Sequence, residues 1–359
     1  MVSVPVIKMT KHAPRSVAIA LMAMFLAALA AGCAPGPENP VVFSGATMGT
    51  TYTVRYYGSP DENLHREIAA KLDELNAKLS TYQPDSEISR FNKHQGRNWF
   101  EVSLETALLV KMSNLISKQS DGAFDITIGP LVNAWGFGPG KRVITPPAQE
   151  TIDELLQHSG YQKLFARDIP PAISKDDPQL QIDLSAIAKG FAVDVVGEML
   201  LKAGITNWLV EIGGEIRISG KKPAADGSES AWQVAIERPV AADRSVQRIL
   251  ALQGFQAVAT SGDYRNFFEY EGQRYSHSIN PQTGWPVSYE GGDEIAAVTV
   301  VSTSAMLADA WATALLVTGA EQALKLADQQ KLAVNLIVRR DGELVELPNQ
   351  AFEWLTAEN

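Results

Sequence analysis

The amino-acid sequence predicts an α+β fold in which mixed sheets are flanked by helices. Short segments rich in β-branched and aromatic residues recur along the chain, and longer segments with apolar residues at helical spacing interrupt them. The two kinds of segment follow in irregular order, which indicates α+β rather than a regular alternation. Hydrophobic residues make up 45% of the 359 residues, enough for a large core in one extended or two joined domains.

The predicted strands are segments in which Val, Ile, Thr, Tyr and Trp cluster. They comprise residues 51–57, 208–211, 215–218, 232–236, 256–259, 295–301 and 334–338. The polar stretch 221–230 lies between two of them. It is predicted to be a surface insertion, because it combines Lys, Pro, Gly and Ser.

Two helices are predicted in the first third of the chain. Residues 61–79 place Ile68 and Leu72 among apolar residues at helical spacing. Ser103 can cap a second helix, because its hydroxyl can accept a hydrogen bond from a free amide of the first turn. The apolar residues of that second helix are Leu104, Leu108 and Leu115.

Two further helices are predicted in the second half. One begins after Ser185, with Phe191 and Met199 facing inward. The other starts near Thr303 or Ser304. It should stop at Gly319, because glycine readily adopts the left-handed conformation of a helix C-cap.

Residues 1–32 are predicted to be a lipoprotein signal peptide. Basic residues precede an uncharged apolar run over 16–31, and small residues then lead to Cys33. Cys33 is the only cysteine, so it cannot form an intrachain disulfide, and its setting resembles a bacterial lipobox, in which the cysteine is lipidated. Residues 33–41 would form a stiff tether and 42–359 the folded domain. A plain transmembrane anchor is the alternative, although the apolar run is short for one.

The charge balance argues against a nucleic-acid partner. The formal net charge is −10, and residues 1–32 hold three of the 31 basic residues and none of the 41 acidic ones. The chain without them would be still more acidic. A phosphate backbone attracts proteins of the opposite charge.

Asp309 and Thr313 are the most informative pair of residues. They lie four residues apart in an otherwise apolar predicted helix and so project from one face. An aspartate in such surroundings needs a donor or a cation, and hard cations such as Mg²⁺ prefer carboxylate and hydroxyl oxygens. The alternative is structural: Asp309 bonds to nearby backbone and Thr313 to its own helix.

Residues 183–190 follow a strand-like segment and lead into the third predicted helix. Free backbone amides at such a helix start favour a phosphate group. Lys189, one turn into the helix, could reach a diphosphate. Ser185 as a simple N-cap and Lys189 as a solvated surface residue are the alternatives.

Three more segments are candidates for a site. Residues 122–130 combine small turn residues with an aromatic and a carboxylate, and could enclose a ring system or form an ordinary core turn. The glycine pair within 211–215 lets the backbone approach another group closely, or forms a β-bulge. His277 lies among hydroxyls before an Asn-Pro turn, where an imidazole could accept a proton or act only as a structural hydrogen-bonding group.

Taken in order, these motifs resemble those of the ApbE family, the FAD:protein FMN transferases. The resemblance extends from about residue 42 to 327, and members are typically bacterial periplasmic lipoproteins, in agreement with the interpretation of Cys33. The motifs that carry it are residues 48–50, 80–82, 122–129, 183–190, 211–215, 260–264, 277–284 and 309–313.

The resemblance implies an ApbE-like, T-fold-like architecture with the FAD site in a cleft between two subdomains. It implies that FAD is cleaved with release of AMP and that FMN is attached by a phosphoester bond to a Thr of an exported target protein. Flavoprotein subunits of redox-driven ion pumps are such targets. Mg²⁺ would be required. The chain would be lipid-anchored on the periplasmic side of the inner membrane by resemblance, while Ala34 also permits the outer membrane.

The resemblance also assigns roles by motif position. Asp309 and Thr313 would bind Mg²⁺ through their side chains, and Ala186 through its backbone carbonyl. Asp309 and His277 would be catalytic, with His277 assisting deprotonation of the acceptor Thr. The FAD site would be lined by Met48, Tyr82, Ala123, Phe124, Asp125, Asp183, Lys189 and Ile279.

Three residues depart from forms common in the family. Ala312 stands where several members have a second acidic residue, Asn280 replaces a frequent Asp, and Glu215 replaces another. Two other functions are alternatives to transfer. One is hydrolysis of FAD to FMN and AMP with water as the acceptor, and the other is storage or delivery of FAD without turnover.

Overall fold

The computed structural model describes residues 39–140, 143–224, 226–240, 245–287 and 293–357. The predicted signal peptide, Cys33 and most of the tether lie outside the described residues. Within the described ranges, no helix is both long and apolar enough to cross a membrane.

The centre of the molecule is an eight-stranded sheet in the order β1-β2-β6-β7-β12-β15-β16-β17, and every pairing between these strands is antiparallel. The long strands β12, β15 and β16 are rich in Val, Ile and Ala, which suits a sheet covered on both faces. The strands are β1 (Val41–Thr47), β2 (Thr50–Tyr56), β6 (Trp208–Ile212), β7 (Glu215–Ser219), β12 (Gln256–Gly262), β15 (Glu294–Ser302), β16 (Ala333–Arg340) and β17 (Glu343–Pro348).

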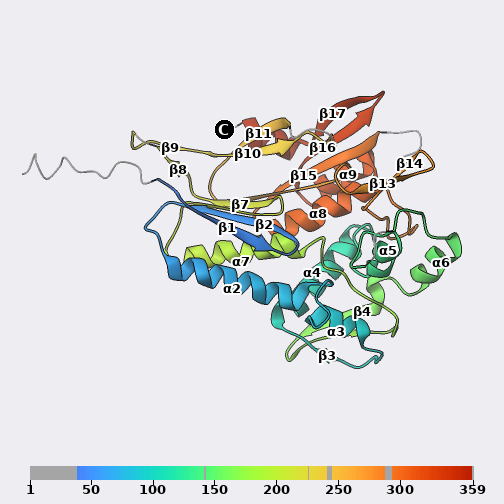
Figure 1. Cartoon of the computed structure of the whole chain (residues 1–359). Helices are drawn as coiled ribbons and strands as arrows, with labels where there is room; N and C mark the ends of the chain where they lie inside the picture. The colour runs from blue at the N-terminus through green and yellow to red at the C-terminus, as the bar shows by residue number, and fades with distance from the viewer. Residues whose placement is uncertain (1–38, 141–142, 225, 241–244, 288–292, 358–359) are drawn as a thin grey trace, which may run out of the picture.

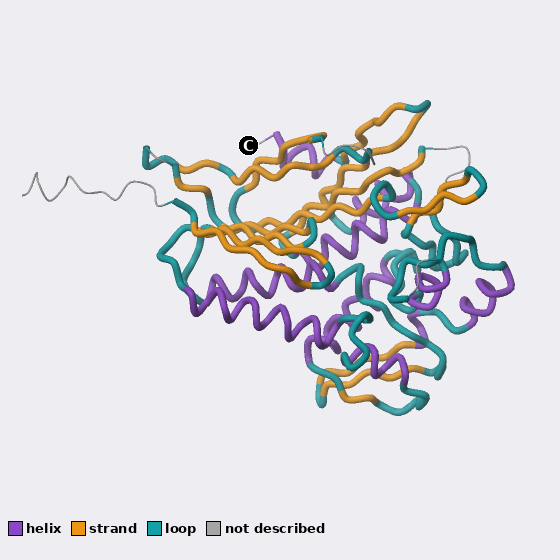
Figure 2. The backbone as a smooth tube through the Cα atoms, in the orientation of Figure 1, coloured by secondary structure: helices purple, strands orange, loops and turns teal. Residues whose placement is uncertain are grey.

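Helices cover one face of this sheet, and a hairpin with one helix covers the other (Figures 1 and 2). The main hydrophobic core lies beneath α2 (Glu62–Leu79), α7 (Ala188–Lys202), α8 (Ala305–Thr318) and α9 (Ala320–Gln329). A second cluster lies under the hairpin of β10 (Trp232–Glu237) and β11 (Val246–Leu252) and under α10 (Gln350–Ala357). The sheet is therefore buried on both sides.

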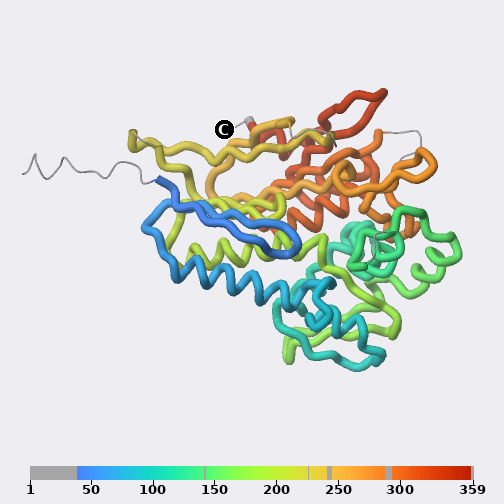
Figure 3. Tube along the Cα trace, viewed as in Figure 1, coloured from blue at the N-terminus to red at the C-terminus, as the bar shows by residue number. Residues whose placement is uncertain are grey.

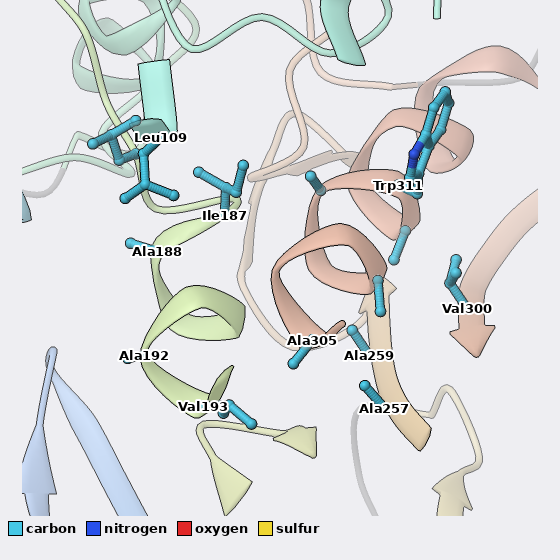
Figure 4. Packing of buried hydrophobic residues seen from close by; sticks show 14 of the residues in the cluster. Leu109, Ile187, Ala188, Ala192, Val193, Ala257, Ala259, Val300, Ala305 and Trp311 are labelled. Atoms are coloured by element: carbon cyan, nitrogen blue, oxygen red, sulfur yellow. The ribbon is translucent and has the colours of Figure 1, made fainter. Parts of the chain in front are cut away.

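Helices α7 and α8 pack closely through small residues (Figure 4). A Cβ atom added at Gly190 would lie 2.2 Å from the carbonyl oxygen of Ala305, so only glycine fits there. Ala188, Ala192 and Val193 on α7 are buried on the same side. This close approach brings the start of α7 beside Asp309 on α8.

Residues 80–182 form a smaller part beside the helical face, drawn in cyan and green in Figure 3. The main core continues into it through Phe91, Leu109 and Ile173, so the two parts share one core. Its elements are α3 (Glu87–Lys93), β3 (Phe100–Glu101), α4 (Leu104–Gln119), α5 (Gly129–Ala134), α6 (Gln149–Gln157), the 3₁₀ turn Tyr161–Lys163, β4 (Leu164–Asp168) and β5 (Pro171–Lys175). The strand order of its sheet is β3-β5-β4.

Two short hairpins complete the fold. One pairs β13 (Phe267–Tyr270) with β14 (Gln273–Ser276) and packs through Phe268 and Tyr275 against Trp135. The other pairs β8 (Lys222–Pro223) with β9 (Glu229–Ser230) within the polar stretch predicted to be an insertion.

The α+β class and all seven predicted strands are confirmed, with shifts of one to three residues at their ends. The first helix is confirmed, with Asp61 as its cap and Ile68 and Leu72 buried. Ser103 caps α4 as predicted, through a hydrogen bond from the Thr106 amide.

Two details of the helix predictions are wrong, and a third is confirmed in part. Leu104, Leu108 and Leu115 of α4 are exposed, because the buried face of that helix consists of Ala107, Leu109, Val110 and Ile116 with small polar residues. Phe191 and Met199 pack against the main core as predicted but are only partly buried, because small residues of α7 make the contact with α8. Gly319 ends α8 with φ 81° and ψ 154°, which is not the left-handed helical conformation, because the next helix starts immediately.

Candidate active site

A buried cluster of three charged side chains lies at one end of the large sheet. The Lys189 Nζ atom is 3.5 Å from Glu215 Oε1 and 3.7 Å from Asp309 Oδ2. Asp309 is 3% exposed and Glu215 is 5% exposed. Three elements far apart in the sequence, α7, β7 and α8, therefore each contribute one charge.

A tight pair of turns places Lys189 and Glu215 together. Met48 and Gly49 have φ of 48° and 73° and join β1 to β2, as a two-residue hairpin turn requires. Gly213, with φ 63°, donates its amide to the Thr51 carbonyl at 3.1 Å. A Cβ atom at Gly213 would lie 3.3 Å from Lys189 Cδ and closer still to Thr50. The glycine pair thus allows the close backbone approach that was one of its two predicted roles.

The charges in this cluster balance only when one of its two carboxylates is protonated. Two carboxylates face one ammonium group, and the Oε2 atom of Glu215 has no hydrogen-bond partner among the described residues. Burial raises the pKa of Asp309, although Lys189 and the Gly190 amide oppose the shift. Burial also raises the pKa of Glu215, with the Asp309 charge adding to it. Burial disfavours the charged form of Lys189, but Asp309 and Glu215 outweigh it, so the pKa of Lys189 is raised.

Further oxygen atoms surround Asp309. The Gly190 amide donates to Asp309 Oδ2 at 3.1 Å instead of to the Ala186 carbonyl four residues earlier. That carbonyl therefore accepts no backbone hydrogen bond within the described ranges. Thr313, one turn after Asp309, lies with its Oγ1 atom 3.2 Å from Ser261 Oγ on β12.

These oxygen atoms fit a hard divalent cation by their chemistry. Carboxylate, carbonyl and hydroxyl oxygens suit Mg²⁺, and an unpaired buried carboxylate oxygen is a group that a cation would satisfy. No cluster of three or more His, Cys, Asp and Glu side chains suited to a metal occurs in the part of the chain that is described. The candidate ligands here are instead Asp309, Thr313 and the Ala186 carbonyl.

His277 is held in a form that can accept a proton. Its Nδ1 atom lies 3.2 Å from the Asn266 carbonyl oxygen, and since a carbonyl only accepts, Nδ1 carries the hydrogen and Nε2 is left as an acceptor. Burial lowers the pKa of His277, and the nearby Lys189 charge lowers it further, against the Asn266 carbonyl and Asp263. The imidazole is therefore neutral at physiological pH and lies within the electrostatic reach of Lys189.

Aromatic residues connect His277 to Tyr82. The Tyr82 hydroxyl donates to the Phe137 carbonyl at 3.5 Å, and the Phe137 ring packs edge-on against the His277 ring with centroids 6.3 Å apart. Tyr82 is 64% exposed, and burial together with the Asp183 charge raises its pKa. Its ring is thus available at the surface beside Asp183.

A cavity of about 410 Å³ opens on the same side, within the range of small-molecule sites. Asn92 fixes one wall, because its amide group makes a hydrogen bond to the Ile182 carbonyl at 2.9 Å and accepts another from the Ile182 amide at 2.8 Å. The lining residues are Thr81, Ser89, Asn92, Lys93, Gln95, Gly129, Asn133, Pro139, Gln181, Ile182 and Asp183.

The segment 183–190 joins this cavity to the charged cluster. Asp183 lines the cavity, and its carboxylate accepts hydrogen bonds from the Ser185 amide and hydroxyl. Lys189 lies in the cluster and also donates to the Ser185 carbonyl at 3.2 Å. Ser185 is not the N-cap of α7, since that position is Ile187 with no side-chain cap, and Lys189 is not a solvated surface residue.

Of the predicted FAD-site residues, Asp183 is the one that lines this cavity, and the others lie outside its lining. Phe124 and Ala123 are buried, so their side chains pack in the interior. The Asp125 carboxylate accepts hydrogen bonds from Thr127 and from the Tyr161 amide, and burial raises its pKa. Ile279 is buried beside Leu131 and Trp135. Met48 lies in the β1–β2 turn next to the glycine pair.

Sequence analysis missed several contributors to this site. Glu215 was noted only as a departure from a family pattern, yet it completes the charged cluster. Asn266 and Phe137, which hold and flank His277, carry no distinctive local signal, because their roles come from a backbone carbonyl and an aromatic edge. A carboxylate directly after two glycines at a strand start was the one signal that could have singled out Glu215.

The fold is that of a flavin transferase, a group-transfer enzyme. The chain matches the structure of flavin transferase ApbE from Vibrio cholerae with a TM-score of 0.79 and 42% identity, over 88% of this chain and 99% of that one. It matches the apo form of the Pseudomonas stutzeri flavinyl transferase ApbE with a TM-score of 0.78 and 39% identity, over 90% of this chain and 99% of that one.

Sequence comparison agrees. The ApbE family model matches residues 48–337. The FAD:protein FMN transferase of Vibrio cholerae is 42% identical over 93% of this chain and 97% of its own length, and that of Haemophilus influenzae is 41% identical over 89% and 92%. The chain belongs to the ApbE family, as the motifs in its sequence predicted.

Proposed function

We propose that this chain is a Mg²⁺-dependent FAD:protein FMN transferase. It would cleave FAD to AMP and attach FMN by a phosphoester bond to a Thr of an exported protein, such as a flavoprotein subunit of a redox-driven ion pump. One observation carries the proposal: Lys189, Asp309 and Glu215 form a buried charged cluster next to a neutral histidine and joined by one segment to a ligand-sized cavity. The similarity to FAD:protein FMN transferases over most of the chain supports it.

The reaction needs few side chains. The Thr oxygen forms a bond to the phosphorus on the FMN side, and the bond from that phosphorus to the bridging oxygen breaks, so the oxygen leaves with AMP. Lys189 is positioned to attract the diphosphate as a point charge, because its ammonium remains protonated at any physiological pH. A bound Mg²⁺ would neutralise phosphate charge and stabilise the charge that grows on departing AMP.

His277 would take the proton from the acceptor Thr. Its Nε2 atom is free to accept because Nδ1 donates to the Asn266 carbonyl. Its lowered pKa keeps the ring neutral at physiological pH, although a lower pKa also makes it a weaker base. Proton transfer is therefore expected to contribute less than charge stabilisation by the cluster.

The rest of the proposal concerns ligand placement and location. The cavity beside Asp183 and Tyr82 would hold part of FAD, with the diphosphate reaching along residues 183–189 to the cluster. Asp309, Thr313 and the Ala186 carbonyl would hold Mg²⁺. We also propose that Cys33 is lipidated after removal of residues 1–32 and that the domain acts on the periplasmic side of a bacterial membrane.

The proposal is tested by incubating the protein with FAD, Mg²⁺ and an exported acceptor domain. A covalently fluorescent acceptor, with the mass of FMN added and one AMP released per adduct, is the expected result. An acceptor in which the target Thr is replaced by Val should remain unlabelled. Release of AMP at full rate without any acceptor would identify a hydrolase instead, and tight FAD binding without AMP release at any Mg²⁺ concentration would identify a carrier.

A further inference from the structure

Glu215 is a buried carboxylate for which the chemistry described so far has no use. Its side chain is 7% exposed at the start of β7, immediately after the glycine pair. Oε1 faces the Lys189 ammonium at 3.5 Å, and Oε2 is buried without a hydrogen-bond partner among the described residues. An unsatisfied carboxylate oxygen is costly in a protein interior, so its retention requires a reason.

The surroundings of Glu215 exclude a simple ion-pair role. Lys189 is the only cation that the structure places against this group in its described residues, and it is shared with Asp309. When both carboxylates are ionised, their charge therefore exceeds the available positive charge by one. Moving a charged side chain from water into the protein interior costs free energy, and that cost is offset only if an oppositely charged partner neutralises the charge.

We propose that Glu215 is a positioning residue and the second carboxylate of the cation site, with Oε1 holding Lys189 and Oε2 facing a divalent cation directly or through one of its waters. This inference rests on the proposed function, because it concerns the same cation. The Oε2 atom, without a partner in the described part of the chain, and the single ammonium group that Glu215 shares with Asp309 both point to a further cation at this place.

A consequence distinguishes this role from a merely structural one. Replacing Glu215 with Gln removes one negative charge while retaining nearly the same shape. Binding of a cation should then weaken, whereas binding of the anionic diphosphate in the absence of metal should be unchanged or tighter. Loss of local structure would weaken both kinds of binding together.

The experiment uses the full chain and Mn²⁺, a cation with the same preference for oxygen ligands that can be followed by electron paramagnetic resonance. Free Mn²⁺ is titrated against wild type and E215Q without FAD, and FAD binding without metal is measured by flavin fluorescence. The matched control is E211Q, because Glu211 accepts the Gly214 amide at 2.8 Å in the same turn but lies outside the charged cluster.

E215Q is expected to bind Mn²⁺ about 10–100-fold more weakly than wild type, the range typical of residues that support a metal site. E211Q should stay within about twofold, since charge near a metal matters most at close range. Metal-free FAD affinity of E215Q should not fall. Mn²⁺ affinity in E215Q equal to that of wild type, or parallel loss of Mn²⁺ and FAD binding, would overturn the assignment.

A second variant keeps the test decisive if E215Q does not fold. E215A removes the carboxylate together with the cost of burying it, so it should fold and bind Mn²⁺ at least about 10-fold more weakly than E211Q. Wild-type affinity in E215A would then overturn the proposal. The two proposals can be contradicted separately. If Mn²⁺ binding depends on Glu215 but the wild-type protein transfers no flavin, only the proposed function is contradicted. If the wild-type protein transfers flavin but E215Q binds Mn²⁺ normally, only this inference is contradicted.

Discussion

Two lysines in this molecule, one partly exposed and one fully buried, have opposite environments. Lys189 lies between Asp309 and Glu215, and their charges raise its pKa despite burial. Lys175, at the end of β5, is 0% exposed, and no carboxylate of the described residues forms an ion pair with its ammonium group. It donates to the carbonyls of Leu180 at 2.8 Å and Phe91 at 3.2 Å and lies 4.9 Å from the centre of the Phe91 ring.

The difference shows how surroundings determine what an ammonium group can do. Burial lowers the pKa of Lys175 to about 8, with Asp177 opposing weakly, so its charge is costly and structural. Two carboxylates stabilise the charge of Lys189, and when both are ionised their combined charge exceeds that of the single ammonium group. Only the arrangement around Lys189 combines a fixed ammonium group that can attract a phosphate with carboxylate oxygens that can attract another cation.

The largest effect is expected from Asp309→Ala, which removes one of the two carboxylates around Lys189. Transfer should fall at least about 10³-fold, because preorganised charge at a phosphoryl centre has effects of this size. Lys189 keeps Glu215 as a partner, so folding and part of the FAD binding should survive. Transfer rates and flavin fluorescence measure the two effects, and a normal rate in this variant would refute the metal assignment.

Lys189→Met removes the ammonium group instead of a carboxylate, so it leaves two buried carboxylates without a cation. The free energy of unfolding at pH 7 should fall by about 3 kcal/mol, as expected when one partner of a buried ion pair is removed. Chemical denaturation measures this loss. The double variant K189M/E215Q should recover part of it, and no recovery would show that the carboxylates do not repel one another.

His277→Ala should slow transfer by about 10²-fold, at the lower end of the range for proton transfer by a side chain. The wild-type rate should fall on acidification through a pKa below the ordinary value near 6.5, since protonated His277 cannot accept a proton. That acidic limb should be absent in the variant. An unchanged pH profile in the variant would argue against the base role.

Lys175→Met should have the smallest effect at pH 7, within about 1 kcal/mol, because relief of desolvation offsets the two carbonyls left without a donor. Between pH 8 and about 10.5 the unfolded chain binds the Lys175 proton and the folded chain does not. Stability therefore rises with pH by up to about 1.4 kcal/mol per unit. The difference between wild type and variant, followed by denaturation, should show this rise, and its absence would mean that Lys175 titrates normally.

Much of the fold follows from local pattern. The seven predicted strands and the helix beneath Ile68 and Leu72 were recognisable because burial on one face imposes a period of two or about 3.6 residues. The exposed Leu104 and Leu108 were misleading, because tertiary packing selected the small-residue face of that helix instead. The edge strand β1 was missed, because Ser, Gly and Ala follow one another at residues 44–46 and interrupt its strand formers.

The site was predictable only in part. Asp309, Lys189 and His277 were found because a charged or titratable residue inside an apolar or turn segment is conspicuous in a sequence. The proximity of these residues in the fold could not be derived from their spacing in the sequence. Sheet order and helix packing bring α7, β7 and α8 together. The pairing of Asn92 with the Ile182 backbone, which shapes the cavity, joins positions 90 residues apart and leaves no local trace.

The contact at Gly190 has a consequence beyond packing. Because no room exists there for even one methyl group, alanine would act as a wedge between α7 and α8. This added methyl group would move Lys189 away from Asp309, although no reactive side chain would be removed or replaced. A loss of activity caused by this one added carbon would show that the enzyme depends on the spacing of its charges as much as on their identity.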